Sequence, residues 1–284
     1  MVTWMPRNAA EADRPPEAAK IQLPNGDKAQ SMNVFTWADH SIVDEQYVVA
    51  IPNDIPTDVT AIVGCAVMTG AGAIYNSAKV QAGESVAIFG VGGVGLAAVA
   101  AARIVGADPI IAIDLDEAKL DFARNQGATI GINASQVEPV SEIHRITGRP
   151  GMFNYNHQPV TGVDYAFDCI GHRTTTEQSL AAVRPSGFGQ LRGGIAVAIG
   201  VPPKNFEIDI RDIFYNEKSL IGSIGGSCIP DRDFPMFLHW YKEGKIDLNT
   251  LVTRRFRLDE INEATTELEQ GKIAGRAILE FSTP

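Results

Sequence analysis

Short apolar runs alternate with alanine-rich or amphipathic segments from about residue 85 to the end of the chain. Most of the runs are nearly continuous in hydrophobic residues, as expected for parallel strands that are covered on both faces. The segments between them predict helices, so the pattern indicates right-handed βαβ crossovers and a doubly wound parallel α/β sheet. The predicted strands are residues 85–91, 109–114, 129–133, 163–169, 195–200 and 218–225.

Capping residues delimit the predicted helices. Gly106 closes an alanine-rich helix over 96–106, and Asp116 begins a helix over 116–127 that ends before Gly127. A third helix is predicted over 174–187. The tail after residue 232 predicts a helix, a loop, a second helix and a last strand.

The first 52 residues follow a different pattern. Residues 6–31 are rich in Pro, Ala, Glu, Asp and Asn, and predict an irregular lobe. The start, "VTWMP", looks like the interior of a strand, and residues 35–52 contain β-type runs broken by polar residues. We expect no apolar run to be long enough to span a membrane, and no signal peptide.

Composition narrows the class of protein. Among 284 residues, 24 are basic and 34 acidic, and the net charge of −10 disfavours a nucleic-acid partner or an anionic membrane surface. Three scattered cysteines are too few for a disulfide framework, so a cytoplasmic protein is expected. Cys169 and Cys228 are expected in the core or in loops, and the five histidines show no metal spacing with Cys65.

Gly90, Gly92 and Gly95 form a G-x-G-x-x-G turn between a predicted strand and a predicted helix. The next strand ends in Asp114, which completes a dinucleotide-binding fingerprint. Gly90 allows the tight turn, Gly92 lets the backbone approach a pyrophosphate, and Gly95 permits close packing of helix on strand. Asp114 would accept the ribose hydroxyls of NAD and repel the 2′-phosphate of NADP, so NAD is the predicted cofactor.

The sequence resembles the zinc-dependent, medium-chain alcohol dehydrogenases. The resemblance rests on "GCAVMTGAGAIYNSAKV" (64–80), the glycine turn, "DCIG", "AIGVPP", "SIGGS" and "GRAILEF", which occur in family order over most of the chain. The tail looks similar to class III formaldehyde dehydrogenases and to their mycothiol-dependent or nicotinoprotein relatives.

The resemblance implies roles for single residues. Cys65 matches a ligand of the catalytic zinc, where an alcohol oxygen binds and from which a hydride passes to the nicotinamide. Thr69 matches a residue that packs on the nicotinamide ring, Lys119 a lysine on the adenosine ribose, and Arg276 an arginine on the pyrophosphate. The backbone at Ile170, Ile199 and Val201 would line the nicotinamide end. Cys65 and Thr69 are therefore the expected catalytic residues, and Cys65 the expected metal ligand.

The sequence also departs from the family. The two other ligands of the catalytic zinc match positions upstream of Met1, and no cysteines stand where some relatives hold a structural zinc. We expect a family member that lacks its N-terminal catalytic part. Its expected organisation is a partial, β-rich GroES-like catalytic domain (1–66), a Rossmann domain (67–217), and the sixth strand with a return to the catalytic domain (218–284).

The expected function is zinc-assisted hydride transfer between an alcohol or aldehyde and NAD, with a small-molecule alcohol, aldehyde or thiol adduct as the substrate. One cysteine cannot hold catalytic zinc, so the expected activity of this chain is impaired. A non-catalytic NAD-binding or interaction module stays open as an alternative, as does a zinc-free enzyme of the quinone-reductase type. A homodimer or higher homo-oligomer is expected, formed through the sixth strand or the segment just before it. Two stretches, 149–160 and 187–194, exceed the family's usual length and are interpreted as surface loops.

Overall fold

The computed structural model describes residues 1–30, 34–38, 40–189 and 191–281. Two compact units divide the chain. Unit 1 comprises Met1–Met68 and Cys228–Pro284, and unit 2 comprises Thr69–Ser227.

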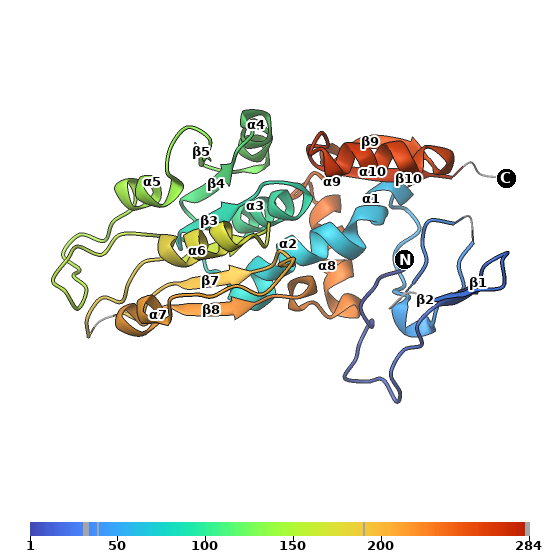
Figure 1. The fold of residues 1–284 in the computed structure, drawn as a ribbon, viewed down its shortest axis with the longest axis horizontal. Helices are drawn as coiled ribbons and strands as arrows, with labels where there is room; N and C mark the ends of the chain where they lie inside the picture. Colours follow the sequence, from blue (N-terminus) through green and yellow to red (C-terminus); the bar gives the residue numbers. More distant parts are fainter. Residues whose placement is uncertain (31–33, 39, 190, 282–284) are drawn as a thin grey trace. The chain divides into compact units, whose positions relative to one another are not determined.

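Unit 2 is built on a six-stranded sheet whose strands are all parallel and run in the order β5-β4-β3-β6-β7-β8 (Figure 1). This confirms the predicted doubly wound sheet, and each strand lies inside its predicted range. The order reverses between β3 and β6, and such a switch point opens a crevice outside the carboxyl ends of these two strands. The strands are β3 (Val86–Phe89), β4 (Ile110–Asp114), β5 (Ile130–Asn133), β6 (Tyr165–Asp168), β7 (Ile195–Ala198) and β8 (Ser219–Gly222).

Both faces of this sheet are covered because successive side chains of a strand point to opposite faces. Ala87 and Phe89 pack with Ile143 and Ala182, so α5 (Pro139–Ile146) and α6 (Arg173–Ala182) cover their face. The opposite face holds Ile88, whose side chain lies 3.5 Å from the place where a Cβ on Gly95 would stand, and Gly95 belongs to α3. The near-continuous apolar strands follow from this double coverage.

The helices of unit 2 include the three that the sequence predicts. Asp116 caps α4 as predicted, with its side chain accepting a hydrogen bond from the Ala118 N–H at 2.9 Å. The predicted 174–187 helix ends earlier, because Val183 adopts an extended backbone. The helices α5 and α7 are additions to the prediction. The bounds are α3 (Gly93–Val105), α4 (Glu117–Gln126), α5 (Pro139–Ile146), α6 (Arg173–Ala182), α7 (Ile210–Asn216) and η4 (Gly225–Ser227).

Unit 1 corrects three predictions near the amino end. The expected irregular lobe contains an antiparallel pair of short strands, β1 and β2. The expected strand at the start is a single antiparallel bridge from Val2 to Val48, and the 35–52 segment contains one helical turn, η1. The side chains of these elements are largely exposed, so no alternating pattern marks them. Their bounds are β1 (Lys20–Gln22), β2 (Lys28–Gln30) and η1 (Glu45–Tyr47).

The carboxyl part of unit 1 ends in a pair of parallel strands, of which the sequence predicts only one. β10 is the expected last strand, whereas its partner β9 was not predicted. Phe256 on β9 packs with Ala264 and Ile273 in a small core. The bounds are α8 (Pro230–Lys242), α9 (Leu248–Leu251), β9 (Val252–Arg257), η5 (Leu258–Glu260), α10 (Ile261–Glu269) and β10 (Arg276–Glu280).

A helical stretch over Thr57–Ala78 corrects the prediction that no apolar run could span a membrane. Its 22 residues are long and apolar enough for that by length and composition, yet 72% of its most apolar window is buried inside the protein. Burial of this kind is what a core helix shows. The stretch consists of α1 (Thr57–Ile62), the π-helical turn η2 (Val63–Val67), α2 (Met68–Gly72) and the π-helical turn η3 (Ala73–Ala78).

Candidate functional site

The glycine turn lies at the switch point of the sheet, directly after β3. Gly90 has φ +84°, a left-handed conformation that favours glycine, and a Cβ there would stand 2.4 Å from the Ile170 side chain. A Cβ on Gly95 would stand 2.0 Å from the Gly90 carbonyl oxygen, which is too close for any side chain. A Cβ on Gly92, in contrast, would meet no atom within 4 Å. The turn is therefore tight on its inner side and open at Gly92.

The open side coincides with the start of α3, a helix of 13 residues. Gly92 is its N-cap and, lacking a side chain, makes no capping hydrogen bond. The first turn contains no acidic residue. The first amides of a helix carry partial positive charge and point along its axis, so this end can bind a phosphate group whose approach no Cβ blocks.

Asp114, at the end of β4, is bonded to the turn itself. Its Oδ2 accepts a hydrogen bond from the Val91 N–H at 3.0 Å, and its Oδ1 accepts from Leu115 (2.8 Å) and Asp116 (3.2 Å). Oδ2 keeps a further lone pair for a ribose hydroxyl. Lys119 lies nearby in sequence on α4 and is half-buried. Asp114 thus holds the turn in position and keeps an acceptor site for a ligand hydroxyl.

Asp168 joins the two loops that follow β6 and β7, a role that the sequence analysis missed. Its buried side chain accepts hydrogen bonds from the N–H groups of Ile170 and Gly171, both at 3.0 Å, and its carbonyl accepts from Ile199 (3.0 Å) and Gly200 (2.9 Å). The predicted cofactor-binding backbone at Ile170 and Ile199 therefore uses its N–H groups internally. The signal was present in the motif "DCIG", an acid at a strand end followed by glycine.

Exposed apolar side chains gather after the carboxyl ends of the strands of unit 2. Val201 is 87% exposed and Ile170 50% exposed, although both are aliphatic. Leu115, after β4, and Ile224, after β8, are exposed as well. Apolar side chains placed around a phosphate-binding turn can cover the flat rings of a nucleotide.

Cys65 and Arg276 line one groove of about 650 Å³ in unit 1, together with Trp4 and Trp37. Cys65 is exposed in the π-helical turn η2, and such turns occur often at functional sites. The Nε of Arg276 is buried and has no hydrogen-bond partner among the described residues. Thr69, the other predicted catalytic residue, is half-buried in α2 and belongs to unit 2.

The described residues do not form a metal site. Nowhere in the described ranges do three or more His, Cys, Asp or Glu side chains come together closely enough to hold a metal ion. Neither Cys169 nor Cys228 forms a disulfide within the described part of the chain. Burial raises the pKa of the Cys169 thiol, and the neighbouring Asp168 carboxylate adds to this. The thiol of Cys228 is buried and donates to the Met68 carbonyl at 3.3 Å.

Comparison with known proteins identifies the family. The family model described as zinc-binding dehydrogenase matches residues 93–243, more than half of the chain. The chain belongs to the zinc-binding dehydrogenases. This confirms the resemblance to zinc-dependent medium-chain alcohol dehydrogenases, and NAD and zinc are cofactors that fit this family.

Individual zinc-binding dehydrogenases align over most of the chain. The class-3 alcohol dehydrogenase of Cereibacter sphaeroides is 32% identical over 242 residues, which cover 85% of this chain and 62% of that protein. The S-(hydroxymethyl)glutathione dehydrogenase of Paracoccus denitrificans is 32% identical over 250 residues, 87% of this chain and 64% of that protein. The crystal structure of benzyl alcohol dehydrogenase from Acinetobacter calcoaceticus superposes with a TM-score of 0.74 at 30% identity. The superposition covers 85% of this chain and 62% of that protein. The chain thus spans about three fifths of the length of these relatives.

Proposed function

We propose that this chain is an NAD-dependent oxidoreductase of the alcohol dehydrogenase type. Its substrate would be an alcohol, an aldehyde or a thiol adduct, as the names of the relatives indicate. The observation that carries the proposal is the open Gly92 at the switch point, beside a helix amino end and the Asp114 carboxylate.

The residues of this chain would hold the cofactor as follows. The amides at the start of α3 would bind the pyrophosphate, and Asp114 and Lys119 would bind the adenosine ribose. Thr69 and the loops at Ile170, Ile199 and Val201 would line the nicotinamide, which accepts the hydride when the cofactor is bound. The described residues do not fit a catalytic zinc, because Cys65 is joined by no second and third ligand among them.

Calorimetric titration with NAD and NADP tests the cofactor assignment. NAD should bind at least about tenfold more tightly, because Asp114 would repel a 2′-phosphate. Asp114→Ala should reduce the ratio of NAD affinity to NADP affinity. Asp114→Asn should reduce the same ratio, while its amide oxygen can still accept the hydrogen bond from the Val91 N–H. Equal affinities of the unmutated chain for both cofactors would contradict the proposal.

A non-catalytic NAD-binding module is the second candidate, and the lack of a three-ligand metal cluster in the described ranges favours it. Elemental analysis and an alcohol-oxidation assay on the same NAD-binding preparation distinguish the two. About one zinc per chain with turnover supports the enzyme, whereas NAD binding without zinc or turnover supports the module.

The setting of the protein belongs to the same proposal. The acidic composition and the three cysteines, none of which forms a disulfide among the described residues, support a cytoplasmic location. The edge strand β8, which is hydrogen-bonded to β7 at the end of the sheet order, offers its outer edge to a second copy, so we include a homodimer.

A further inference from the structure

Five aromatic side chains lie on the two long loops and on α7, at the amino ends of the strands of unit 2. Four of them line a groove of about 430 Å³, which is the size of a site for one small molecule. Because the glycine turn follows the carboxyl end of β3, this groove lies at the opposite edge of the same parallel sheet. The groove lining comprises Tyr155, Ser186, Phe188, Gly189, Phe214, Tyr215 and Glu217.

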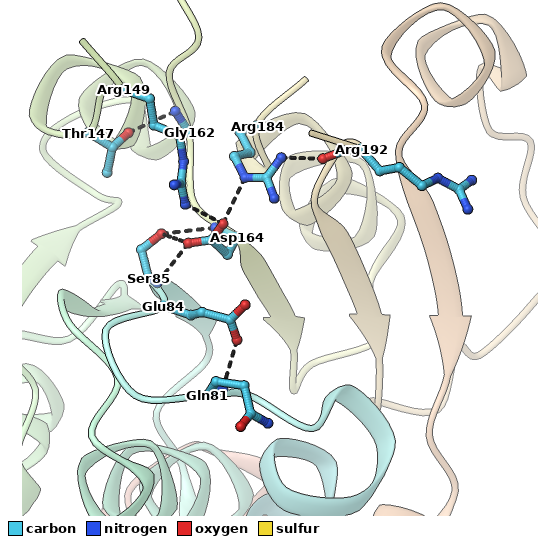
Figure 2. A network of polar contacts seen from close by, with 9 residues as sticks. All are labelled: Gln81, Glu84, Ser85, Thr147, Arg149, Gly162, Asp164, Arg184 and Arg192. Atoms are coloured by element: carbon cyan, nitrogen blue, oxygen red, sulfur yellow. Dashed lines mark hydrogen bonds and ion pairs between the residues drawn. The ribbon is translucent and has the colours of Figure 1, made fainter. Parts of the chain in front are cut away.

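A buried carboxylate anchors the two loops that carry the groove (Figure 2). Asp164, only 4% exposed, binds Arg149 at 2.5 Å and Arg184 at 2.7 Å through the same oxygen. Its other oxygen accepts from the Ser85 N–H (3.0 Å) and hydroxyl (2.8 Å). Arg184 also donates to the Arg192 carbonyl. Arg149 begins the first long loop and Arg192 lies in the second, so one fixed point holds both.

The aromatic rings of the groove are exposed in pairs. Tyr155 packs edge to face on Phe188, with ring centroids 5.6 Å apart, and Phe214 on Tyr215 at 5.2 Å. Phe188 is 65% and Phe214 73% exposed. Four rings exposed to solvent cost free energy that a bound ligand would recover. The faces of such rings carry partial negative charge and attract cations.

Glu217 gives the groove a formal negative charge. It ends α7 in the left-handed conformation, with φ +48°, at a position where helices usually place glycine. A non-glycine residue in this conformation carries backbone strain, and strain of this kind is concentrated at functional sites. Among the described lining residues there is no lysine, arginine or histidine, so nothing in the lining neutralises Glu217.

We propose that this groove binds a small quaternary ammonium compound. The methylated head would rest against the faces of Phe188, Phe214 and the two tyrosines, and the Glu217 carboxylate would balance its charge. A neutral apolar ligand would gain nothing from Glu217, and an anion would be repelled by it. The site is separate from the cofactor crevice, because it is built before the strands and not after them.

Calorimetric or NMR titration of the full chain with choline tests the proposal, with 3,3-dimethylbutan-1-ol as the neutral probe of the same shape. Choline should bind at least about tenfold more tightly than the neutral alcohol. Phe188→Ala should weaken choline binding about fivefold, and Glu217→Gln by a similar factor. Phe153→Ala is the matched control, because Phe153 is exposed on the same loop but does not line the groove, and its choline affinity should stay unchanged.

Glu217→Gly separates loss of the site from loss of the fold. It removes the carboxylate and relieves the left-handed strain, so the melting temperature should rise while choline binding weakens. The proposal is overturned if both probes bind equally or if Phe188→Ala leaves choline binding unchanged. Absence of choline binding combined with a self-association that Phe188→Ala abolishes would also overturn it, and would assign the groove to a second copy of the chain.

Discussion

Two glycines of the turn after β3 have opposite surroundings, although they are two residues of one motif. Gly95 is packed against the Gly90 carbonyl, and Gly92 faces open space. Gly95 is therefore needed for packing of the folded chain, and Gly92 leaves room for a ligand to approach the backbone. The spacing of the glycines assigns these two functions only by analogy with other proteins. The atoms that a Cβ would meet at each glycine give the physical reason for each function.

Alanine substitutions should separate these functions. Gly95→Ala should lower the free energy of unfolding by about 1–3 kcal/mol or more, since its Cβ would overlap a backbone oxygen. Gly92→Ala should cost no more than about 1 kcal/mol, because helix N-caps tolerate alanine at that price, but should weaken NAD binding at least about tenfold by blocking the pyrophosphate. Urea unfolding and calorimetry check the two effects, and a Gly92→Ala chain with unimpaired NAD binding would count against the site.

Asp164 supplies a pH-dependent contribution to stability. Burial alone would raise the pKa of its carboxyl, but hydrogen bonds from Ser85 and Arg184 and the charge of Arg149 outweigh burial and lower the pKa. The stabilisation is therefore complete above the unfolded-state pKa of about 3.9 and is lost as the pH falls through the lower folded-state pKa.

Asp164→Asn should remove this contribution. The variant should be less stable at pH 7, because the Arg184 charge stays buried without its partner. Below about pH 4 its free energy of unfolding should fall less steeply than that of the unmutated chain, by up to about 1.4 kcal/mol per pH unit. Denaturant unfolding over a pH series measures both slopes, and identical slopes would show that Asp164 does not titrate as described.

Among the helices and strands, those buried on both faces could be predicted from the sequence, whereas a strand that depends on pairing with another strand could not. The strands of unit 2 were predictable because both of their faces are covered, which leaves apolar runs in the sequence. β9, "VTRRFR", buries only Phe256, and its register depends on β10, so no local pattern marks it. α5 was predictable in principle, since Glu138 and Pro139 form a helix start whose carboxylate accepts from Val140 and Ser141.

Glycine spacing and a strand-terminal acid were sufficient to predict that the turn follows β3 and that Asp114 ends β4, while their role in binding NAD stays a prediction. They were insufficient for Asp168, whose role depends on two loops distant in sequence, and for the aromatic groove, which three separate segments build.

Shortening the first long loop should leave the cofactor site intact. The loop folds back on itself through an antiparallel bridge between Phe153 and Pro159, ahead of β6 and therefore away from the glycine turn. Replacing residues 153–158 with two glycines keeps Arg149 on Asp164. NAD affinity should change by less than about twofold, because closure entropy varies slowly with loop length. A loss of NAD binding in a chain that still melts cooperatively would contradict this positional argument.

At the scale of the whole molecule, the two units differ in how the chain builds them. Unit 2 is one continuous segment, whereas unit 1 combines both ends of the chain. The family match lies mainly in unit 2, the unit that contains the glycine turn.

Self-association tests the outer edge of β8. Leu220 and Ile221 are only half-buried there, and a second copy paired by a two-fold axis would cover them. Sedimentation at micromolar concentration should show a dimer, and Leu220→Lys should shift it toward monomer. Val137→Lys, at another exposed apolar position, should have no effect. A monomeric unmutated chain would exclude the dimer.

The Asp168 cross-link has a consequence for the timing of cofactor binding. Asp168 is hydrogen-bonded to both loops, after β6 and after β7. The backbones of Gly171 and Gly200 are so close that a Cβ on Gly200 would stand 2.2 Å from the Gly171 nitrogen. We therefore expect the two loops to move together. Amide exchange at Ile170, Gly171, Ile199 and Gly200 should accordingly be slow before NAD is added. The wall offered to the nicotinamide would then exist in advance, so that association requires no slow loop ordering and loses little conformational entropy.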